Sequence, residues 1–478
     1  MPERARRRFG ARAAAVFAAC LASSHGGARA EGPSIALDGP AVTRTETEAR
    51  RGEVIGWDAF AAAVEEVHPL MTAARAGLDA LRARLSQADW AWFPSLRMTA
   101  GTGIVPRITG DALDSKADWT SFGPLIDARL ELAQPLWTFG RIEALQRAAE
   151  AGVGVGRAGV EVARWELRLR AAEAFFASAL ARELDALLGE GQVWIAKAEA
   201  RMESQRDAES VDYDQLEHLR LKTRVAEFHE LKTRNDLLGV TARAGMRVLL
   251  QLPDDKPAPE PEGDLVPLEL PLHDAEVYVA LARRNDPGLQ LARARAGAAR
   301  ELAGWRWSEL WPNLVLAGDV RSTHAPTVAP QSSIFANDPF NRTFGTLALG
   351  FEWRLDVPQR LFVADEARAS ARRAEAEAEV QADLMEVNVR RLVQDLLNQH
   401  ALLDVYRGSR KAAQGWLTAT WDTYESGFGS FRDVMDALVQ FYEKRLGYLQ
   451  VVHAHNLAVF RLSQAVGVDI RAIRAEPE

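Results

Sequence analysis

The chain has 478 residues, an apolar content of 47% and a formal net charge of −8. That length and apolar content suffice for a large folded core, and an acidic chain without a Lys/Arg block argues against nucleic acid as a partner. No apolar run approaches the roughly 20 residues that a membrane-spanning helix needs.

Residues 1–30 predict an export signal. A basic segment at 4–12 precedes an apolar segment at 13–22, and a small-x-small cleavage site ends at Ala30. The only cysteine, Cys20, lies in the apolar segment within a weak lipobox. Two outcomes are open: lipidation of Cys20, or cleavage after Ala30. Either way, a single cysteine excludes an internal disulfide.

A flexible leader is expected at 31–55, followed by a first structural repeat at 56–252. Apolar residues recur at helical spacing before Pro94, and strands and long Ala/Leu/Glu/Arg-rich helical runs follow. Helices this long and uniform are typical of coiled-coil-like hairpins. The repeat is therefore expected to hold a helix, two strands and a helical hairpin, at about 57–91, 94–105, 122–137 and 141–252.

Six prolines among acidic residues predict a linker at 253–273. A second repeat at 274–467 then follows the same plan, and a tail occupies 468–478. The pair His68-Pro69 corresponds to Asp286-Pro287, about 218 residues later. The second repeat is expected to hold a helix, two strands and a hairpin, at about 274–310, 312–321, 344–356 and 360–466.

Each predicted strand alternates apolar and polar residues, so each has one apolar and one charged face. Two interpretations fit this pattern: a soluble antiparallel sheet on a core, or a membrane β-barrel that is polar toward its lumen. Four strands are too few to enclose a lumen, so a barrel would need several chains. The charged residues would pair across strands or tune permeation: Arg97, Asp127, Arg129, Glu131, Asp319, Glu352, Arg354 and Asp356.

Several motifs are specific. The second strand ends in Gln-Pro-Leu-Trp-Thr-Phe-Gly-Arg at 134–141, and Pro94 and Pro312 each open a strand. The second hairpin turn carries Tyr424, Gly427, Ser430, Asp433 and Val434, and the last helix ends in Leu462-x-x-x-x-Gly467. With the duplicated plan, these motifs resemble the TolC-type outer-membrane efflux family over about 55–468.

The resemblance implies a mainly α fold with a membrane β-barrel portion. Three copies would form a 12-stranded barrel in the outer membrane of a Gram-negative bacterium and a periplasmic α-helical barrel. It also implies two partners, a periplasmic adaptor protein and an inner-membrane pump of the RND or ABC type. The chain departs from the family pattern at three places: 206–210, where the first turn lacks glycine, 355–360, and Gln251.

The hairpin turns hold the candidate gate residues, because carboxylates that recur around a trimer form rings at a constriction. Asp is also a favoured N-cap, and Asp212 and Asp433 lie where the returning helices would begin. The turn candidates are Asp212, Asp214, Gly427, Gly429, Ser430, Asp433 and Asp436.

No catalytic, cofactor or metal site is predicted. The G-x-G-x-x-G string at 154–159 follows a helical pattern rather than a strand, so we interpret its glycines as sites of close helix approach. His453 and His455 are two apart on a helix and point to different faces. The resemblance implies a passive exit duct of a tripartite efflux or type I secretion system. The alternatives are a periplasmic coiled-coil adaptor and an exported enzyme, which lacks a nucleophile here.

Overall fold

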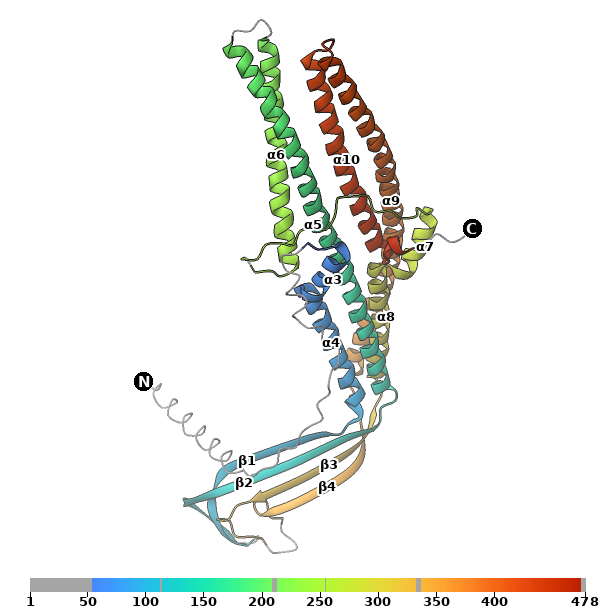
Figure 1. The fold of residues 1–478 in the computed structure, drawn as a ribbon. Coiled ribbons are helices and arrows are strands. Elements are labelled where there is room, and N and C mark those ends of the chain that lie inside the picture. Colours follow the sequence, from blue (N-terminus) through green and yellow to red (C-terminus); the bar gives the residue numbers. More distant parts are fainter. Residues whose placement is uncertain (1–53, 112–113, 209–212, 254, 332–336, 474–478) are drawn as a thin grey trace. The chain divides into compact units, whose positions relative to one another are not determined.

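The computed structural model describes residues 54–111, 114–208, 213–253, 255–331 and 337–473 (Figure 1). All of them belong to one compact unit, Arg50–Glu478. The predicted export signal, Cys20 and Asp212 lie outside the described residues.

The chain follows the same order of elements twice, as the duplicated motifs indicate. Each copy has two short helices, two strands and two long helices (Figure 1). The first copy consists of α3 (Trp57–Val67), α4 (Pro69–Asp89), β1 (Ser95–Gly110), β2 (Ser115–Trp137), α5 (Arg141–Asp207) and α6 (Gln215–Leu249). The second consists of α7 (Ala275–Asn285), α8 (Pro287–Ser308), β3 (Asn313–His324), β4 (Arg342–Glu352), α9 (Val357–Glu425) and α10 (Phe431–Val466). Two short 3-10 turns, η1 (Trp90–Trp92) and η2 (Ile470–Ala472), complete the described fold.

The opening helix of each copy is broken where the sequence predicts one continuous helix. The break lies at His68 in the first copy and at Asp286 in the second, each directly before a proline. The proline ring disfavours helical backbone in the residue before it. The residue before each proline caps the helix that follows. His68 Nδ1 accepts a hydrogen bond from the Leu70 amide at 3.1 Å, and Asp286 Oδ1 accepts one from the Leu289 amide at 2.5 Å.

The four strands form one antiparallel sheet in the order β1-β2-β3-β4. Hydrogen bonding between β2 and β3 joins the two copies, with Leu130 opposite Val320. Both strands of the first copy extend into the predicted polar loop: β1 ends at Gly110 and β2 begins at Ser115.

β4 ends at Glu352, so Arg354 and Asp356 do not lie on a strand as the alternation predicted. Asp356 occupies the N-cap position of α9, and Arg360 one turn later pairs with it at 2.6 Å (Nε to Oδ1). Pro358 fits the start of α9, because proline is favoured in the first turn of a helix.

The 134–141 motif forms the turn from β2 into α5. Phe139 and Gly140 both have positive φ, +50° and +84°. Glycine adopts such backbone at little cost, so Gly140 suits the reversal. The amide group of Gln134 donates to the Trp92 carbonyl at 2.7 Å, which ties the end of the strand to η1.

The long helices pack around two apolar cores. α5 contacts α3, α4, α6, α8 and α10, while α9 contacts α7, α8 and α10. In the first core Trp57 packs on Phe175, Phe176 and Phe460, with ring centroids 4.5 to 5.9 Å apart. This cluster joins the first short helix to α5 and to the last long helix.

The Pro-rich segment between the copies lies against α10. Asn456, which is fully buried, donates to the Val266 carbonyl and accepts from the Leu268 amide, both at 2.9 Å. His455 Nε2 lies 3.1 Å from the Leu268 carbonyl oxygen. Three bonds from two adjacent side chains thus fix the middle of the segment.

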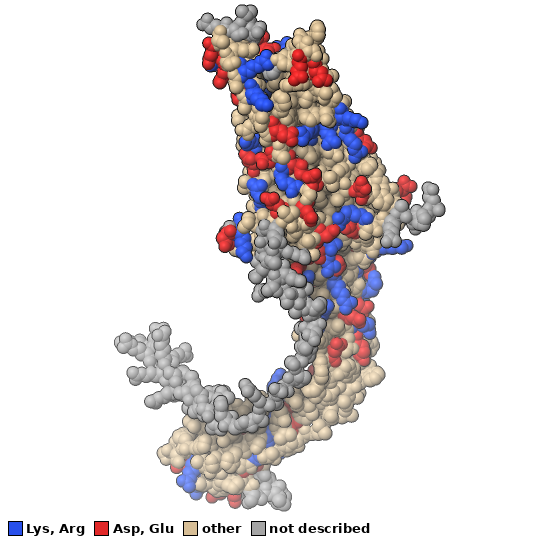
Figure 2. Space-filling model, in the orientation of Figure 1, with Lys and Arg blue, Asp and Glu red and all other residues tan. Residues whose placement is uncertain are grey.

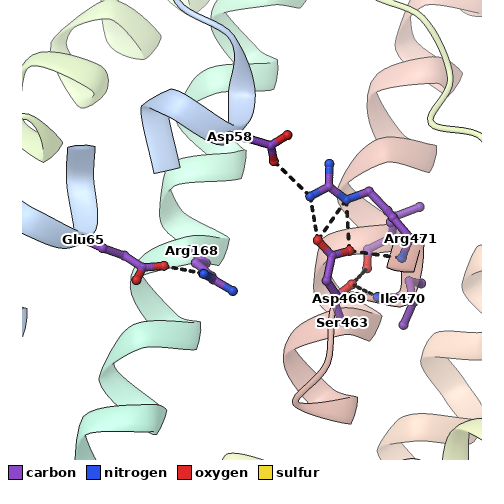
Figure 3. Close-up of polar contacts among 8 residues, drawn as sticks. Asp58, Glu65, Arg168, Ser463, Asp469, Ile470 and Arg471 are labelled. Atoms are coloured by element: carbon purple, nitrogen blue, oxygen red, sulfur yellow. Dashed lines mark hydrogen bonds and ion pairs between the residues drawn. The ribbon is translucent and has the colours of Figure 1, made fainter. Parts of the chain in front are cut away.

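The residues after α10 also pack onto the fold. Arg471 Nη2 lies 2.6 Å from Asp469 Oδ2 and 3.3 Å from Asp58 Oδ1 on α3 (Figure 3). Ile470 is 1% exposed. The predicted tail at 468–478 therefore contains an ordered anchor that ties the end of the chain to its first helix.

Candidate functional site

The turn of the second hairpin is built by glycine and serine. Gly427 has φ +81°, and a Cβ on Gly429 would lie 2.9 Å from the Tyr424 amide nitrogen. Ser430 is the N-cap of α10, and its hydroxyl accepts from the Asp433 amide at 3.2 Å. The cap is therefore Ser430, and the prediction that Asp433 caps this helix is wrong. Asp433 instead receives a hydrogen bond from the Ser430 hydroxyl at 2.8 Å.

In the first hairpin the N-cap of α6 is Asp214, two residues after the predicted position Asp212. Asp214 accepts from the Leu216 amide at 2.8 Å and is the N-cap residue. At the end of α5, Arg206 pairs with Asp207 at 2.9 Å. The absence of glycine here contrasts with the second turn.

Asp436 lies among charged residues of both signs. It lines a groove of about 440 Å³ together with Glu217, Arg220 and Arg224 of α6 and Arg432 of α10. The pKa of Arg224 is raised mainly by its hydrogen bond to Glu227, with smaller contributions from the charges of Glu443 and Asp436. Asp436 is thus in electrostatic contact with α6, which the sequence did not indicate.

The two hairpins contact each other near these turns. Arg201 of α5 donates to the hydroxyl of Tyr424 on α9, and its guanidinium carbon lies 5.6 Å from that ring's centroid. Further from the turns, Arg445 of α10 pairs with Glu190 of α5 at 2.5 Å. These contacts join helices that are more than 200 residues apart in the chain.

The charged face of the sheet forms a linked set of ion pairs. Arg97 lies 4.0 Å from Glu131. Arg129 lies 3.2 Å from Glu131 and 2.5 Å from Asp319. A further pair joins Asp127 to Arg321 at 2.8 Å. The predicted pairing across strands is present for five of the eight candidates, Arg97, Asp127, Arg129, Glu131 and Asp319. Arg321 is a member that the candidate residues omitted. Glu352 lies opposite Asn313 at the start of β3.

The other face of the sheet is apolar and exposed in the single chain. Figure 2 shows few charged side chains over the strands and many over the helices. Exposed apolar residues on this face include Leu96, Met98, Ile126, Leu130, Leu347, Leu349 and Phe351.

The three glycines of the G-x-G-x-x-G string differ in their surroundings. Gly156 lies where a Cβ would come within 2.8 Å of a Leu81 methyl carbon, so it permits close approach of α4, whereas Gly154 and Gly159 have open space. Within the described part of the chain, no group of three or more His, Cys, Asp or Glu could hold a metal ion.

None of the described helices is both long and apolar enough to cross a membrane.

The described chain has the fold of solved outer-membrane channels, among them CmeC of Campylobacter jejuni and the open state of MtrE of Neisseria gonorrhoeae. CmeC is 12% identical and matches with a TM-score of 0.66, over 88% of this chain and 87% of its own. MtrE is 17% identical and also gives a TM-score of 0.66, over 88% of this chain and 93% of its own. A membrane protein from Pseudomonas aeruginosa gives a TM-score of 0.69 at 16% identity, over 88% of this chain and 94% of its own. No curated protein sequence matches the chain significantly.

Residues 278–468 match the family model described as outer membrane efflux protein. This match bears out the resemblance to the outer-membrane efflux family over the second copy. Over most of its length the chain shares the fold of solved outer-membrane channels.

Proposed function

We propose that this protein is a passive outer-membrane exit duct, built from three copies of the chain. The observation that carries the proposal is the four-stranded sheet, which has one exposed apolar face and one face of linked charges. Lipid requires every backbone polar group to be paired, so such a sheet must close through other copies. Three copies contribute twelve strands, a number within the range known for membrane barrels.

The helices of the three copies would line a periplasmic tunnel that continues the barrel. The efflux family match supports this role, as does the common fold with outer-membrane channels. Energy would come from an inner-membrane pump of the RND or ABC type, joined through a periplasmic adaptor. An adaptor identity for this chain is less well supported, because adaptors carry one helical hairpin and this chain has two, each preceded by a strand pair.

The hairpin turns would form the periplasmic gate. Asp214, Asp433 and Asp436 would each recur three times around the axis, and rings of carboxylates attract cations at a constriction. Replacing Asp433 with asparagine is expected to weaken the block of single-channel current by a multivalent cation. An unchanged block would place Asp433 away from the permeation path.

One experiment tests the duct directly. Envelope fractionation followed by a denaturing gel of unheated and heated samples should give an outer-membrane, heat-modifiable trimer. Purified trimer should then produce discrete conductance steps in a planar bilayer. A water-soluble monomer would overturn the proposal. Mass spectrometry of the mature N-terminus separates lipidation at Cys20 from cleavage after Ala30.

A further inference from the structure

A second cavity between the two hairpins has aromatic walls. Its volume is about 490 Å³, and it lies between α5 on one side and α9 and α10 on the other. The ring of Trp194 meets that of Trp421 edge-on at a centroid distance of 5.6 Å, and Trp421 lies 6.4 Å from Tyr424. Aromatic rings of this kind present large apolar faces that stack well on a flat ligand.

The charge at this cavity is positive. Lys197 and Arg201, one helical turn apart on α5, both line it, and no acidic side chain is among its described lining residues. The Lys197 ammonium lies 5.1 Å from the centroid of Trp194. Within the described ranges Lys197 forms no ion pair, and its side chain is exposed at the rim of the cavity.

The cavity continues into an apolar recess. A smaller space of about 140 Å³ shares Trp194, Met435 and Leu438 with it. Leu187, Phe228 and Leu231 are among the side chains that line this recess. The first space offers a cationic rim and aromatic walls, and the recess is mostly apolar, with Arg224, Glu227 and Glu443 also among its lining residues.

We propose that this cavity binds an amphipathic aromatic carboxylate. The ring system would pack beside the contacting Trp194 and Trp421 rings. The carboxylate would meet Lys197 through a charge-assisted hydrogen bond. The volume falls within the range of about 300–1,000 Å³ that is usual for small-molecule sites. A cationic ligand would be repelled by the same rim. Because the walls belong to both hairpins, a bound ligand would hold the hairpins at their present spacing.

The proposal does not depend on the duct function, because it rests only on contacts within one chain. A test should therefore locate binding at the cavity itself. The full-length protein in detergent is irradiated with the photoreactive acid 4-benzoylbenzoate or with its neutral amide, and labelled peptides are mapped by mass spectrometry. The acid is expected to label the peptides that carry Trp194, Trp421 or Met435 several-fold more than the amide does.

Three variants sharpen the test. Lys197→Gln should lower labelling by the acid about threefold, since exposed ion pairs contribute up to about 1 kcal/mol, and leave labelling by the amide unchanged. Lys222→Gln is the matched control, an exposed lysine of α6 outside the cavity, and should behave as the parent protein does. Thr418→Trp places an indole at the exposed rim of the cavity and should abolish labelling there while the helical circular dichroism is retained.

Equal labelling by acid and amide, or an unchanged Lys197→Gln variant, would overturn the assignment of an anionic ligand. Labelling only at other sites would overturn the cavity itself. Bilayer conductance is measured separately, so failure of the duct proposal is distinguishable from failure of this one.

Discussion

Arg129 of β2 lies 2.5 Å from Asp319 of β3 (Nε to Oδ2), so an ion pair joins the two copies of the duplicated unit across the sheet. Arg129 also contacts Glu131 on its own strand at 3.2 Å. One cation thus bridges two carboxylates on the charged face.

Neutralising Asp319 should change ion selectivity more than stability. In the Asp319→Asn variant the charged face gains one net positive charge while the hydrogen-bond acceptor is largely kept. If this face lines the pore, the reversal potential in a salt gradient should shift toward anion permeability. Asp79→Asn on α4, where the aspartate is exposed and pairs with Arg82, is the control and should leave the potential unchanged. An unshifted potential for Asp319→Asn would show that Asp319 is not exposed to permeating ions.

Gly467→Ala should destabilise the protein. Gly467 ends α10 with φ +71°, and a Cβ there would lie 2.0 Å from the Asn285 carbonyl oxygen. Strained backbone of this kind costs about 1–3 kcal/mol before the clash is relieved. The unfolding temperature of the purified protein should therefore fall.

Gly408→Ala is the matched control for that variant. Gly408 lies inside α9 with open space around it, so alanine there should leave the unfolding temperature unchanged or raise it. Equal unfolding temperatures for the parent and Gly467→Ala proteins would contradict the geometry described at the end of α10.

Arg471 should govern part of the acid sensitivity. Burial tends to raise the pKa of Asp469, but the hydrogen bonds and charge of Arg471 outweigh it, so the pKa lies below its ordinary value of 3.8. The unfolded chain then binds the proton more readily than the folded one. The stability contribution is present above pH 3.8 and is lost as pH falls through the folded pKa.

Arg471→Gln should remove that contribution. Its unfolding temperature should be lower at pH 7, and the further fall between pH 6 and pH 3 should be smaller than in the parent protein. Arg84→Gln, which alters an exposed arginine of α4, should follow the parent at every pH. A parallel fall in Arg471→Gln and the parent would mean that Asp469 does not titrate as argued.

His455 should make the protein less stable in mild acid. Burial lowers its pKa below 6.5; the hydrogen bond to the Leu268 carbonyl opposes this, and the neighbouring charge of His400 lowers the pKa further. His453 behaves similarly, through burial and then the charge of Arg461. For a histidine with a lowered pKa, stability is present above pH 6.5 and is lost as pH falls below it.

His455→Gln should therefore reduce the fall in unfolding temperature between pH 7.5 and pH 5. Glutamine keeps a hydrogen-bond donor for the Leu268 carbonyl but cannot be protonated in this pH range, so the comparison separates the effect of protonation from the loss of the hydrogen bond. His229→Gln, at an exposed position of α6, serves as the control and should show the full fall. A full fall in His455→Gln would assign the pH response to other groups.

Much of the fold was predictable because its signals are local. The helical spacing of apolar residues, the alternation along the strands and the His68-Pro69 and Asp286-Pro287 pairs each report on a few neighbouring residues. The breaks at those two prolines were also available from the sequence, since proline restricts the residue before it. Ser430 as the cap was less visible, because Asp433 three residues later is an equally favourable cap type.

The sequence by itself determined the repeated order of elements, the charged and apolar faces of the strands and the glycine-bearing second turn. The tertiary structure alone decided which charges meet, such as Arg129 with Asp319 and Arg201 with Tyr424, and which rings enclose the cavity beside Lys197. The physical reason is that strand register and helix packing bring together residues about 190 to 220 positions apart, and no local periodicity encodes such a partner.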